Sequence, residues 1–300
     1  MFTNRINDII QKISEANPLH AKKIKKNLSR GIIDLDEAEG FFDTLSEYLE
    51  STGRDINYCV SCYLLLIKDM FYYRQKFHET GCYANNSSHQ VQKNIYGNTD
   101  VMEYHMHGLL LAQFLWPDQF HRFTFFKQQL LSLHTPIESY LEIGAGHGLY
   151  VKAALNCLPQ LKKVDVLDIS ATSLDMCRYF TSSPIVNYHL KNAFDLEENK
   201  AYDFISIAEV LEHLEDPAAM LFKIRKLLKQ HGTIFLSTPV NSPMIDHIYL
   251  FRSITEIKEL ITSQGLCIVC DTYMSSEDLP YDESLAKKVP IMYAAFLRAC

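Results

Sequence analysis

The 300-residue chain lacks the features that mark membrane, secreted and nucleic-acid-binding proteins. No apolar run approaches the ~18–20 residues of a membrane span, and the first residues lack the apolar core of a signal peptide. The net charge of −7 gives no overall basic field for nucleic acid. We therefore expect a cytoplasmic protein with no membrane partner, and a nucleic-acid partner is not favoured. The sequence leaves the oligomeric state unknown.

The cysteines do not predict a metal site. The chain has eight, which is consistent with a reducing compartment, where thiols persist and disulfides are rare. Two C-x-x-C pairs, Cys59/Cys62 and Cys267/Cys270, have the spacing of a structural zinc site. However, the first pair lies in an apolar helical segment and the second in the middle of a predicted strand, without the turn glycines of a zinc knuckle. We interpret them as small hydrophobic core residues.

The first 135 residues have the periodicity of helices. Apolar residues recur at helical spacing, with breaks at prolines and glycines, in residues 3–16, 18–30, 34–51, 54–78 and 100–133. A basic run at residues 22–30 is interpreted as a solvated helix face, because no aromatic residues interleave for base stacking. We expect two domains, a helical cap or substrate domain at 1–135 and a second domain at 136–300.

The most informative segment is residues 140–149, where an apolar strand runs into three glycines spaced G-x-G-x-G. Glycine allows positive φ and a close backbone approach to a ligand, and the N–H groups of the following helix face that ligand. Leu149 occupies the position of the last glycine in the dinucleotide pattern G-x-G-x-x-G, so binding of a nicotinamide dinucleotide is not expected. Together with Glu142, the glycines resemble motif I of the class I S-adenosylmethionine-dependent methyltransferases of small-molecule type.

Four further segments resemble this superfamily in order. They are a second strand ending in Asp168, a third strand followed by residues 191–195, a fourth at 202–207 followed by E-V-L-E-H, and a fifth at 232–239. The resemblance implies an α/β fold with a seven-stranded, mostly parallel sheet, an antiparallel last strand at 290–297 and an N-terminal all-helical cap. It implies S-adenosylmethionine as co-substrate, with Asp168 accepting the ribose hydroxyls and Asn192 with the Ala193 N–H at the adenine edge. The cofactor-binding residues implied are Glu142, Gly144, Ala145, Gly146, Gly148, Asp168, Ile169, Asn192, Ala193, Phe194, Ala208 and Glu209.

Residues 81–98, between two helical blocks, are polar and poor in apolar side chains, which is typical of a mobile lid loop. A tyrosine that faces a sulfonium gains about 0.5–2 kcal/mol of cation–π attraction. The candidates for such a cage at the methyl end are Tyr72, Tyr73, Tyr96 and Tyr104. His105 and His107 are two residues apart, so a chelating pair is not expected.

The segment E-V-L-E-H places Glu209, Glu212 and His213 at i, i+3 and i+4, on one side of a helical turn. The pattern resembles that of metal-dependent ubiquinone-pathway O-methyltransferases and small-RNA ribose methyltransferases, in which a further histidine completes the shell, and His247 is the candidate here. The same letters also occur in relatives without a metal, in which the histidine shapes the pocket or acts as a base. A divalent metal is therefore possible at Glu209, Glu212, His213 and His247 but not favoured.

We expect methyl transfer to an oxygen, nitrogen or carbon of a small-molecule substrate in biosynthetic metabolism. The expected catalytic residues are His213, Glu212, Tyr104 and Tyr96. Two alternatives remain: a lyase that cyclises the amino-acid part of the cofactor and releases methylthioadenosine, and a catalytically silent binding protein. Incubation with the cofactor alone separates the two reactions by their products.

Overall fold

The computed structural model describes residues 4–197 and 199–300, and the helical N-terminal half is as expected. Its helices are α1 Asn4–Ala16, α2 Pro18–Leu28, α3 Leu35–Ser51, α4 Ile56–Thr80, α5 Ser88–Val91, α6 Thr99–Leu115 and α7 Pro117–Leu131. Asp34 caps α3 by accepting the backbone N–H groups of Asp36 and Glu37. Pro117 begins α7, so the expected break in 100–133 is confirmed.

Seven strands in the described residues form one sheet, in the order β3-β2-β1-β4-β5-β7-β6. The strands are β1 Ser139–Ile143, β2 Lys163–Asp168, β3 Val186–Leu190, β4 Tyr202–Ala208, β5 Leu228–Val240, β6 Leu266–Ser275 and β7 Ile291–Ala299. Strands β1 to β5 pair in parallel, whereas β7 pairs antiparallel with both β5 and β6. The predicted sheet and its antiparallel last strand are thus confirmed.

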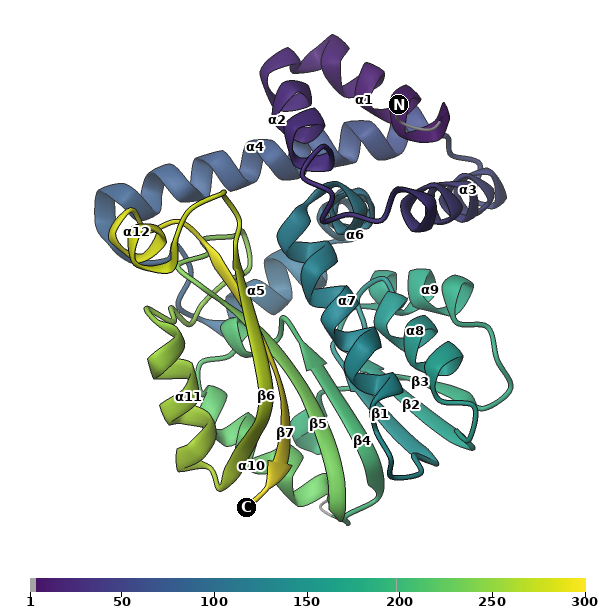
Figure 1. Ribbon diagram of the computed structural model, residues 1–300, viewed down its shortest axis with the longest axis vertical. Coiled ribbons are helices and arrows are strands. Elements are labelled where there is room, and N and C mark those ends of the chain that lie inside the picture. The colour runs from purple at the N-terminus through teal and green to yellow at the C-terminus, as the bar shows by residue number, and fades with distance from the viewer. Residues whose placement is uncertain (1–3, 198) are drawn as a thin grey trace.

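Helices cover both faces of the sheet, as a parallel sheet requires. They are α8 Leu149–Cys157, α9 Ala171–Phe180, α10 Pro217–Leu227, α11 Ile254–Ser263 and α12 Tyr281–Ala286. Alternation along β1 sends Tyr140 into the cluster shared with α7, α8 and α9, and Leu141 into the cluster shared with α10 and α11. The cap lies over the carboxyl ends of the parallel strands (Figure 1). No helix in the described ranges has the length and apolarity needed to cross a membrane.

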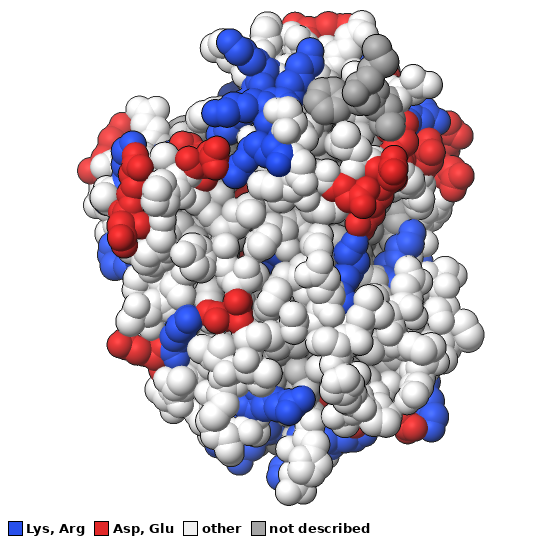
Figure 2. All heavy atoms as spheres, viewed as in Figure 1, with Lys and Arg blue, Asp and Glu red and all other residues white. Residues whose placement is uncertain are grey.

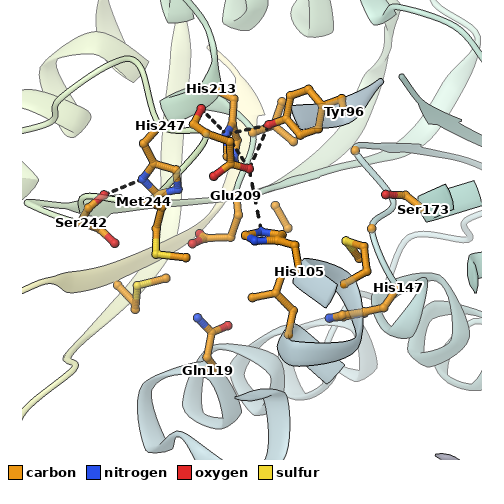
Figure 3. Close-up of a pocket in the computed structure, with 18 of the residues that line it drawn as sticks. Tyr96, His105, Gln119, His147, Ser173, Glu209, His213, Ser242, Met244 and His247 are labelled. Carbon is orange, nitrogen blue, oxygen red and sulfur yellow. Dashed lines mark hydrogen bonds and ion pairs between the residues drawn. The ribbon is translucent and has the colours of Figure 1, made fainter. Parts of the chain in front are cut away.

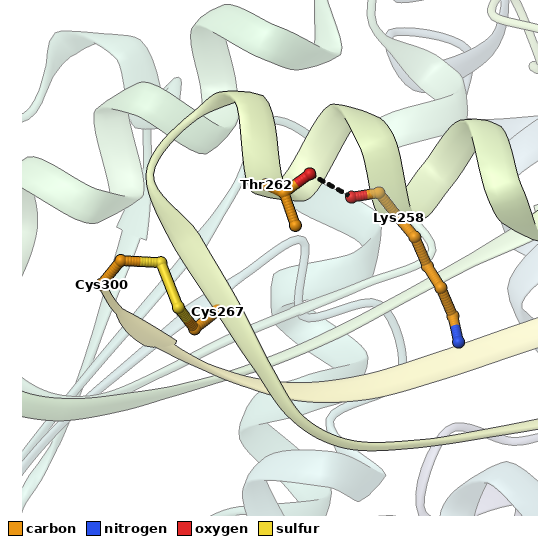
Figure 4. The surroundings of a disulfide bond; sticks show 4 residues. All are labelled: Lys258, Thr262, Cys267 and Cys300. Carbon is orange, nitrogen blue, oxygen red and sulfur yellow. Dashed lines mark hydrogen bonds between the residues drawn. A yellow bond between two sulfur atoms is a disulfide. The ribbon is translucent and has the colours of Figure 1, made fainter.

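Two expectations need correction. The predicted lid loop is partly helical, because Ser87 caps α5, which continues into a π-helical turn, η1, at Gln92–Tyr96. The cysteines are not all free, since Cys267 of β6 is bonded to Cys300 (Figure 4). The antiparallel register pairs Cys267 with Arg298 at the end of the sheet and leaves the Cα atoms of the two cysteines 5.4 Å apart.

The basic run lies on α2, where Lys22, Lys23, Lys25 and Lys26 are exposed. Figure 2 shows blue side chains gathered over α2, with red acidic side chains on either side of them. Two of the basic side chains have acidic neighbours, with Arg30 2.8 Å from Asp278 and Lys23 3.9 Å from Glu277. Such contacts are typical of a solvated helix face, which is the interpretation the sequence favoured.

Candidate active site

A cavity of about 610 Å³ lies between the carboxyl ends of the strands and the cap. Its size is within the ~300–1,000 Å³ range of small-molecule sites. Eleven of the twelve expected cofactor-binding residues line one part of it, together with Ile143 of β1 and Leu167 of β2, whereas side chains of α2, α4 and α6 line another. Six of the nine methionines of the chain line this cavity: Met70, Met102, Met106, Met220, Met244 and Met292.

The glycine loop after β1 needs its glycines for two different reasons. All three have positive φ, between 50° and 79°. A Cβ on Gly144 would lie 2.4 Å from Cγ2 of Val210, and one on Gly148 would lie 2.6 Å from Sγ of Cys177. Gly144 and Gly146 line the cavity, but Gly148 does not. Gly148 lets α8 pack closely against α9, and its expected contact with the cofactor stays a prediction.

The two acids expected at the cofactor lie at the ends of adjacent strands. Asp168 accepts hydrogen bonds from Gly146 N at 3.1 Å and Ser170 N at 2.8 Å, and burial raises its pKa to about 6. Glu142 is buried and accepts a hydrogen bond from the Tyr140 hydroxyl, and burial raises its pKa to about 8. Both carboxyl groups line the cavity, so their acceptor oxygens are available to a nucleoside.

The expected adenine end follows β2 and β3. Ile169 and Phe194 both line the cavity and are 36% and 39% exposed, so each presents apolar surface to a ligand. Asn192 and Ala193 lie between them in the chain, and the Asn192 side chain accepts from Phe194 N at 3.0 Å. Ala145 and Ala208 also line the cavity.

His213 lies at the opposite end of the expected cofactor site, in a network of hydrogen bonds (Figure 3). Its Nδ1 is 3.1 Å from the backbone oxygen of Asp246 and 2.9 Å from the Tyr96 hydroxyl. A carbonyl oxygen only accepts, so Nδ1 carries the hydrogen and Nε2 has the lone pair. The Tyr96 hydroxyl in turn donates to the Asp246 carboxylate at 3.2 Å. The network fixes the ring and the tautomer of His213.

The charges around His213 favour its protonated form. Burial lowers the pKa of His213, but the carboxylates of Asp246 and Glu212 outweigh burial and raise it. The Asp246 pKa falls to about 2, because the neighbouring histidines outweigh the effect of burial. His213 Nε2 is 3.8 Å from Glu212 Oε1, and Nδ1 is 3.6 Å from Asp246 Oδ2. A proton taken up at Nε2 would therefore lie near Glu212, and the charged ring would have Asp246 beside its other nitrogen.

Three of the four candidate metal ligands come together. Ligand atoms of Glu212, His213 and His247 lie within 4.8 Å of one another. His247 Nδ1 donates to the Ser242 carbonyl at 2.5 Å, which leaves its Nε2 as an acceptor, and the buried Oε1 of Glu212 has no hydrogen-bond partner. Such a carboxylate–imidazole set fits Mn²⁺, Fe²⁺ or Zn²⁺ better than Mg²⁺.

Glu209 is separate from this cluster, because the turn after β4 is not the single helical turn that the spacing predicted. Glu209 has a φ of 55°, and the following 3₁₀ turn, η3, covers only Leu211–His213. Glu209 Oε1 lies 2.7 Å from Nη1 of Arg122 and accepts from Ser237 Oγ at 3.0 Å. The fourth ligand expected from the sequence is thus paired elsewhere.

Two of the four expected catalytic residues do not line the cavity. His105 lines the cavity, but adjacent positions on a helix differ in direction by about 100°. The side chain of Tyr104 therefore points elsewhere, and its hydroxyl donates to Asp69 at 2.6 Å. Glu212 is fully buried behind His213 and accepts from Thr238 at 2.8 Å. Tyr72 and Tyr73 do not line the cavity either. Among the described residues, Tyr96 and Tyr150 are the tyrosines that do.

Sequence reasoning missed Arg122 and Asp246. Arg122 lies in the middle of an amphipathic helix that precedes the glycine loop, and a lone arginine there has no motif around it. Asp246 is next to His247 in the loop after β5, and only the fold brings it to Tyr96 and His213. A buried position for a charged residue is a signal that only a structure provides.

With this geometry established, known proteins identify the family. A family model described as a methyltransferase domain matches residues 113–272, more than half of the chain. The chain belongs to this methyltransferase family.

The ubiquinone biosynthesis O-methyltransferase of Xanthomonas campestris pv. campestris is 33% identical over 107 residues, which cover 34% of this chain and 44% of that protein. The mitochondrial enzyme of that name from Dictyostelium discoideum is 25% identical over 142 residues, 41% of this chain and 44% of that protein. The matches thus span less than half of these relatives.

Solved structures of methyltransferases have the same fold. The N-methyltransferase NodS from Bradyrhizobium japonicum, in complex with S-adenosylhomocysteine, has a TM-score of 0.51 at 16% identity, over 71% of this chain and 99% of that chain. An S-adenosylmethionine-dependent methyltransferase of Leishmania major has a TM-score of 0.52 at 19% identity, over 70% and 82% of the two chains. At this identity the likeness concerns the fold, which is that of a class I S-adenosylmethionine-dependent methyltransferase, as predicted.

Proposed function

We propose that this methyltransferase transfers the S-methyl group of S-adenosylmethionine to an oxygen or nitrogen of a small-molecule acceptor, with His213 as general base. The observation that carries the proposal is the fixed tautomer of His213, a residue that lines the cavity and keeps the lone pair on Nε2, with Glu212 beside Nε2 and Asp246 beside Nδ1. The relatives named as O-methyltransferases support an oxygen acceptor. We further propose that residues 1–135 form the cap that holds the acceptor and 136–300 the part that holds the cofactor.

The chemistry needs little beyond positioning. The sulfonium supplies its own leaving group, so the enzyme must hold the nucleophile in line with the methyl carbon at near-attack distance. A hydroxyl acceptor loses its proton to Nε2 of His213 as the new C–O bond forms and the S–C bond breaks. The imidazolium then has Asp246 and Glu212 as counter-charges. The methionine-rich lining favours an acceptor with an apolar body.

We propose that the cyclase alternative is weaker than methyl transfer. It rested on a tyrosine-rich cap around the sulfonium, but Tyr72, Tyr73 and Tyr104 lie outside the lining of the cavity. Incubation with S-adenosylmethionine alone tests this directly. Methylthioadenosine as the product would favour the cyclase, whereas S-adenosylhomocysteine formed only with an acceptor would favour the transferase.

His213→Ala should lower kcat by about 10²–10⁴-fold, the usual loss when proton transfer is removed. The active base is neutral, so kcat of the unaltered enzyme should rise with pH through the raised pKa of His213 and then level off. His134→Ala, at an exposed loop position, is the matched control. A kcat that is unchanged in His213→Ala would refute the general base.

Chelation separates the base from a metal. A base-only enzyme should keep its rate in EDTA. If Glu212, His213 and His247 hold a cation that the reaction needs, activity should be lost in EDTA and restored by Mn²⁺ or Mg²⁺. Loss and recovery of activity would mean that a cation polarises the acceptor, so that His213 is not the general base. The proposal of methyl transfer would still hold.

A further inference from the structure

The cap part of the cavity is apolar in its interior and charged at its opening. Buried or partly buried apolar side chains of the cap line the interior: Ile24, Ile67, Met70, Leu109 and Trp116. Phe71 also lines the cavity and is 61% exposed, so the cavity reaches solvent at this end. Three charged side chains line the same end, and they are Lys23 of α2, Arg74 of α4 and Glu277 of the loop before α12.

The three charged side chains contact one another across the opening. Arg74 Nη1 donates to Glu277 Oε1 at 2.9 Å, and Lys23 Nζ is 3.9 Å from the same oxygen. Arg30 of α2 donates to Asp278, the next residue of the loop, at 2.8 Å. Figure 1 shows α12, which follows this loop, beside one end of α4. The opening therefore lies between the cap and the loop that joins β6 to α12.

Positive charge exceeds negative charge at this opening. Burial raises the pKa of Glu277, but the hydrogen bond and charge of Arg74, together with Lys23 and Lys287, outweigh burial and lower it. Further lysines of α2 are exposed on the same helix as Lys23: Lys22, Lys25 and Lys26. Figure 2 shows the basic side chains gathered over α2. The field at the opening thus favours an anionic ligand over a cationic one.

Arg74 has hydrogen-bond donors that the protein does not use. A guanidinium carries five N–H groups in a planar fork that matches a carboxylate or a phosphate. Within the described part of the chain, only Nη1 of Arg74 has a hydrogen-bond partner, and the side chain is 31% exposed. Asn27 and Ser276 also line the cavity, and their amide and hydroxyl groups are neutral donors. An anionic group at this opening would therefore meet two cations and two neutral donors.

The residues at the opening are specific to this chain within the comparison made above. Lys23, Asn27, Arg74, Ser276 and Glu277 all lie outside residues 113–272, which match the methyltransferase model. Asp168 and the glycine loop lie inside that range. The expected cofactor site is thus a shared feature, whereas the charged opening belongs to the cap and to the loop that contacts it.

We propose that the acceptor carries an anionic group, a carboxylate or a phosphate, at the end away from the methylated atom, and that Arg74 and Lys23 bind this group. The apolar body of the acceptor then lies in the interior of the cap part, between the opening and His213. The anionic group takes the place of Glu277 on Arg74, so Glu277 competes with the acceptor. The inference rests on the proposed function in that it takes the cap part as the place of the acceptor.

Trp116 provides a direct measure of binding in the cap part, because it is the sole tryptophan and lines the cavity. Three probes share one alkyl chain and differ in the head group: decanoate, decyl phosphate and decan-1-ol. Titrations that follow Trp116 fluorescence, with the cofactor part filled by S-adenosylhomocysteine, give their affinities. At least one anionic probe should bind more tightly than decan-1-ol, and the larger difference identifies the anionic group.

Arg74→Gln should lower the affinity for the anionic probe by about 5- to 20-fold. This lies between the roughly fivefold of an exposed ion pair and the ~100-fold of a buried charge-assisted hydrogen bond. The affinity for decan-1-ol should stay within about twofold, which shows that the variant is folded. Lys25→Gln is the matched control, because Lys25 is exposed on α2 and does not line the cavity.

Glu277→Gln should have the opposite effect, because it releases Arg74 and should tighten binding of the anionic probe only. Weaker binding in this variant would overturn the inference, since Glu277 would then serve only to hold the loop against the cap. An unchanged affinity in Arg74→Gln would overturn it as well. So would equal affinities of charged and uncharged probes, or no binding of the anionic probes, in the unaltered protein. Failure of S-adenosylhomocysteine to bind would instead refute the proposed function.

Discussion

The differences between the site predicted from the sequence and the site in the structure concern mostly single residues. The acid at the end of β2 and the first two glycines could be placed in the cavity from sequence, because strand–glycine–helix spacing constrains them. Tyr104 could not be told from its neighbour His105, since adjacent positions on a helix differ by about 100°. Arg122 and Asp246 belong to the site through tertiary packing alone.

Cofactor binding should depend on pH through Asp168. The carboxylate must be charged to accept two ribose hydroxyls, and burial raises its pKa to about 6. A raised acid pKa means that protonation competes with binding below pH 6, so affinity for S-adenosylhomocysteine should fall toward ~10-fold per pH unit there and be flat above it. Titration calorimetry between pH 5 and 8 checks this. Asp168→Asn should bind S-adenosylhomocysteine weakly at every pH. If its affinity still falls below pH 6, a group other than Asp168 causes the pH dependence.

At the scale of elements, strands were easier to predict than loops. The apolar runs of β1, β2, β4 and β5 gave their positions to within a few residues, since buried parallel strands have continuous apolar sequence. Polar residues 81–98 predicted a loop, but Ser87 caps the short helix α5 within this segment, and Asn98 caps the long helix α6 that follows it. Eight cysteines gave no pairing, because the bond between Cys267 and Cys300 depends on the register of β6 against β7.

The disulfide should stabilise the sheet edge measurably. It closes a loop with a sequence separation of 33, for which typical stabilisation is about 2–4 kcal/mol. Cys300→Ser should lower the free energy of unfolding by this amount in guanidinium titrations, and a reducing agent should have the same effect on the unaltered protein only. Cys82→Ser, at an exposed free thiol, is the control. An unfolding midpoint insensitive to reducing agent would mean that the bond does not form in solution.

At the scale of the whole molecule, the cap and the sheet share one core. A continuous hydrophobic cluster runs from Ile6 of α1 to Phe296 of β7. Phe126 of α7 lies at its centre, with ring centroids 4.9 Å from Tyr150 and 4.7 Å from Phe235. The sequence indicated two domains because helices precede strands, but composition cannot report how much apolar surface the two parts bury against each other. The division into domains at 1–135 and 136–300 therefore remains a prediction, and separate unfolding of the two parts would support it.

Phe126→Ala decides between the two possibilities. Phe126 is fully buried, so its loss should cost about 3–5 kcal/mol. Two probes follow unfolding in urea: the fluorescence of Trp116, the sole tryptophan, at the start of α7, and the reactivity of the buried Cys177 thiol in α9. If the core is one unit, the two probes should give the same midpoint as each other, both in the unaltered protein and in Phe126→Ala. Phe71→Ala, at a side chain 61% exposed, should change stability by no more than about 0.5 kcal/mol. Two separate midpoints in Phe126→Ala would instead show that the cap folds independently, and α7 would then be the helix that couples the domains.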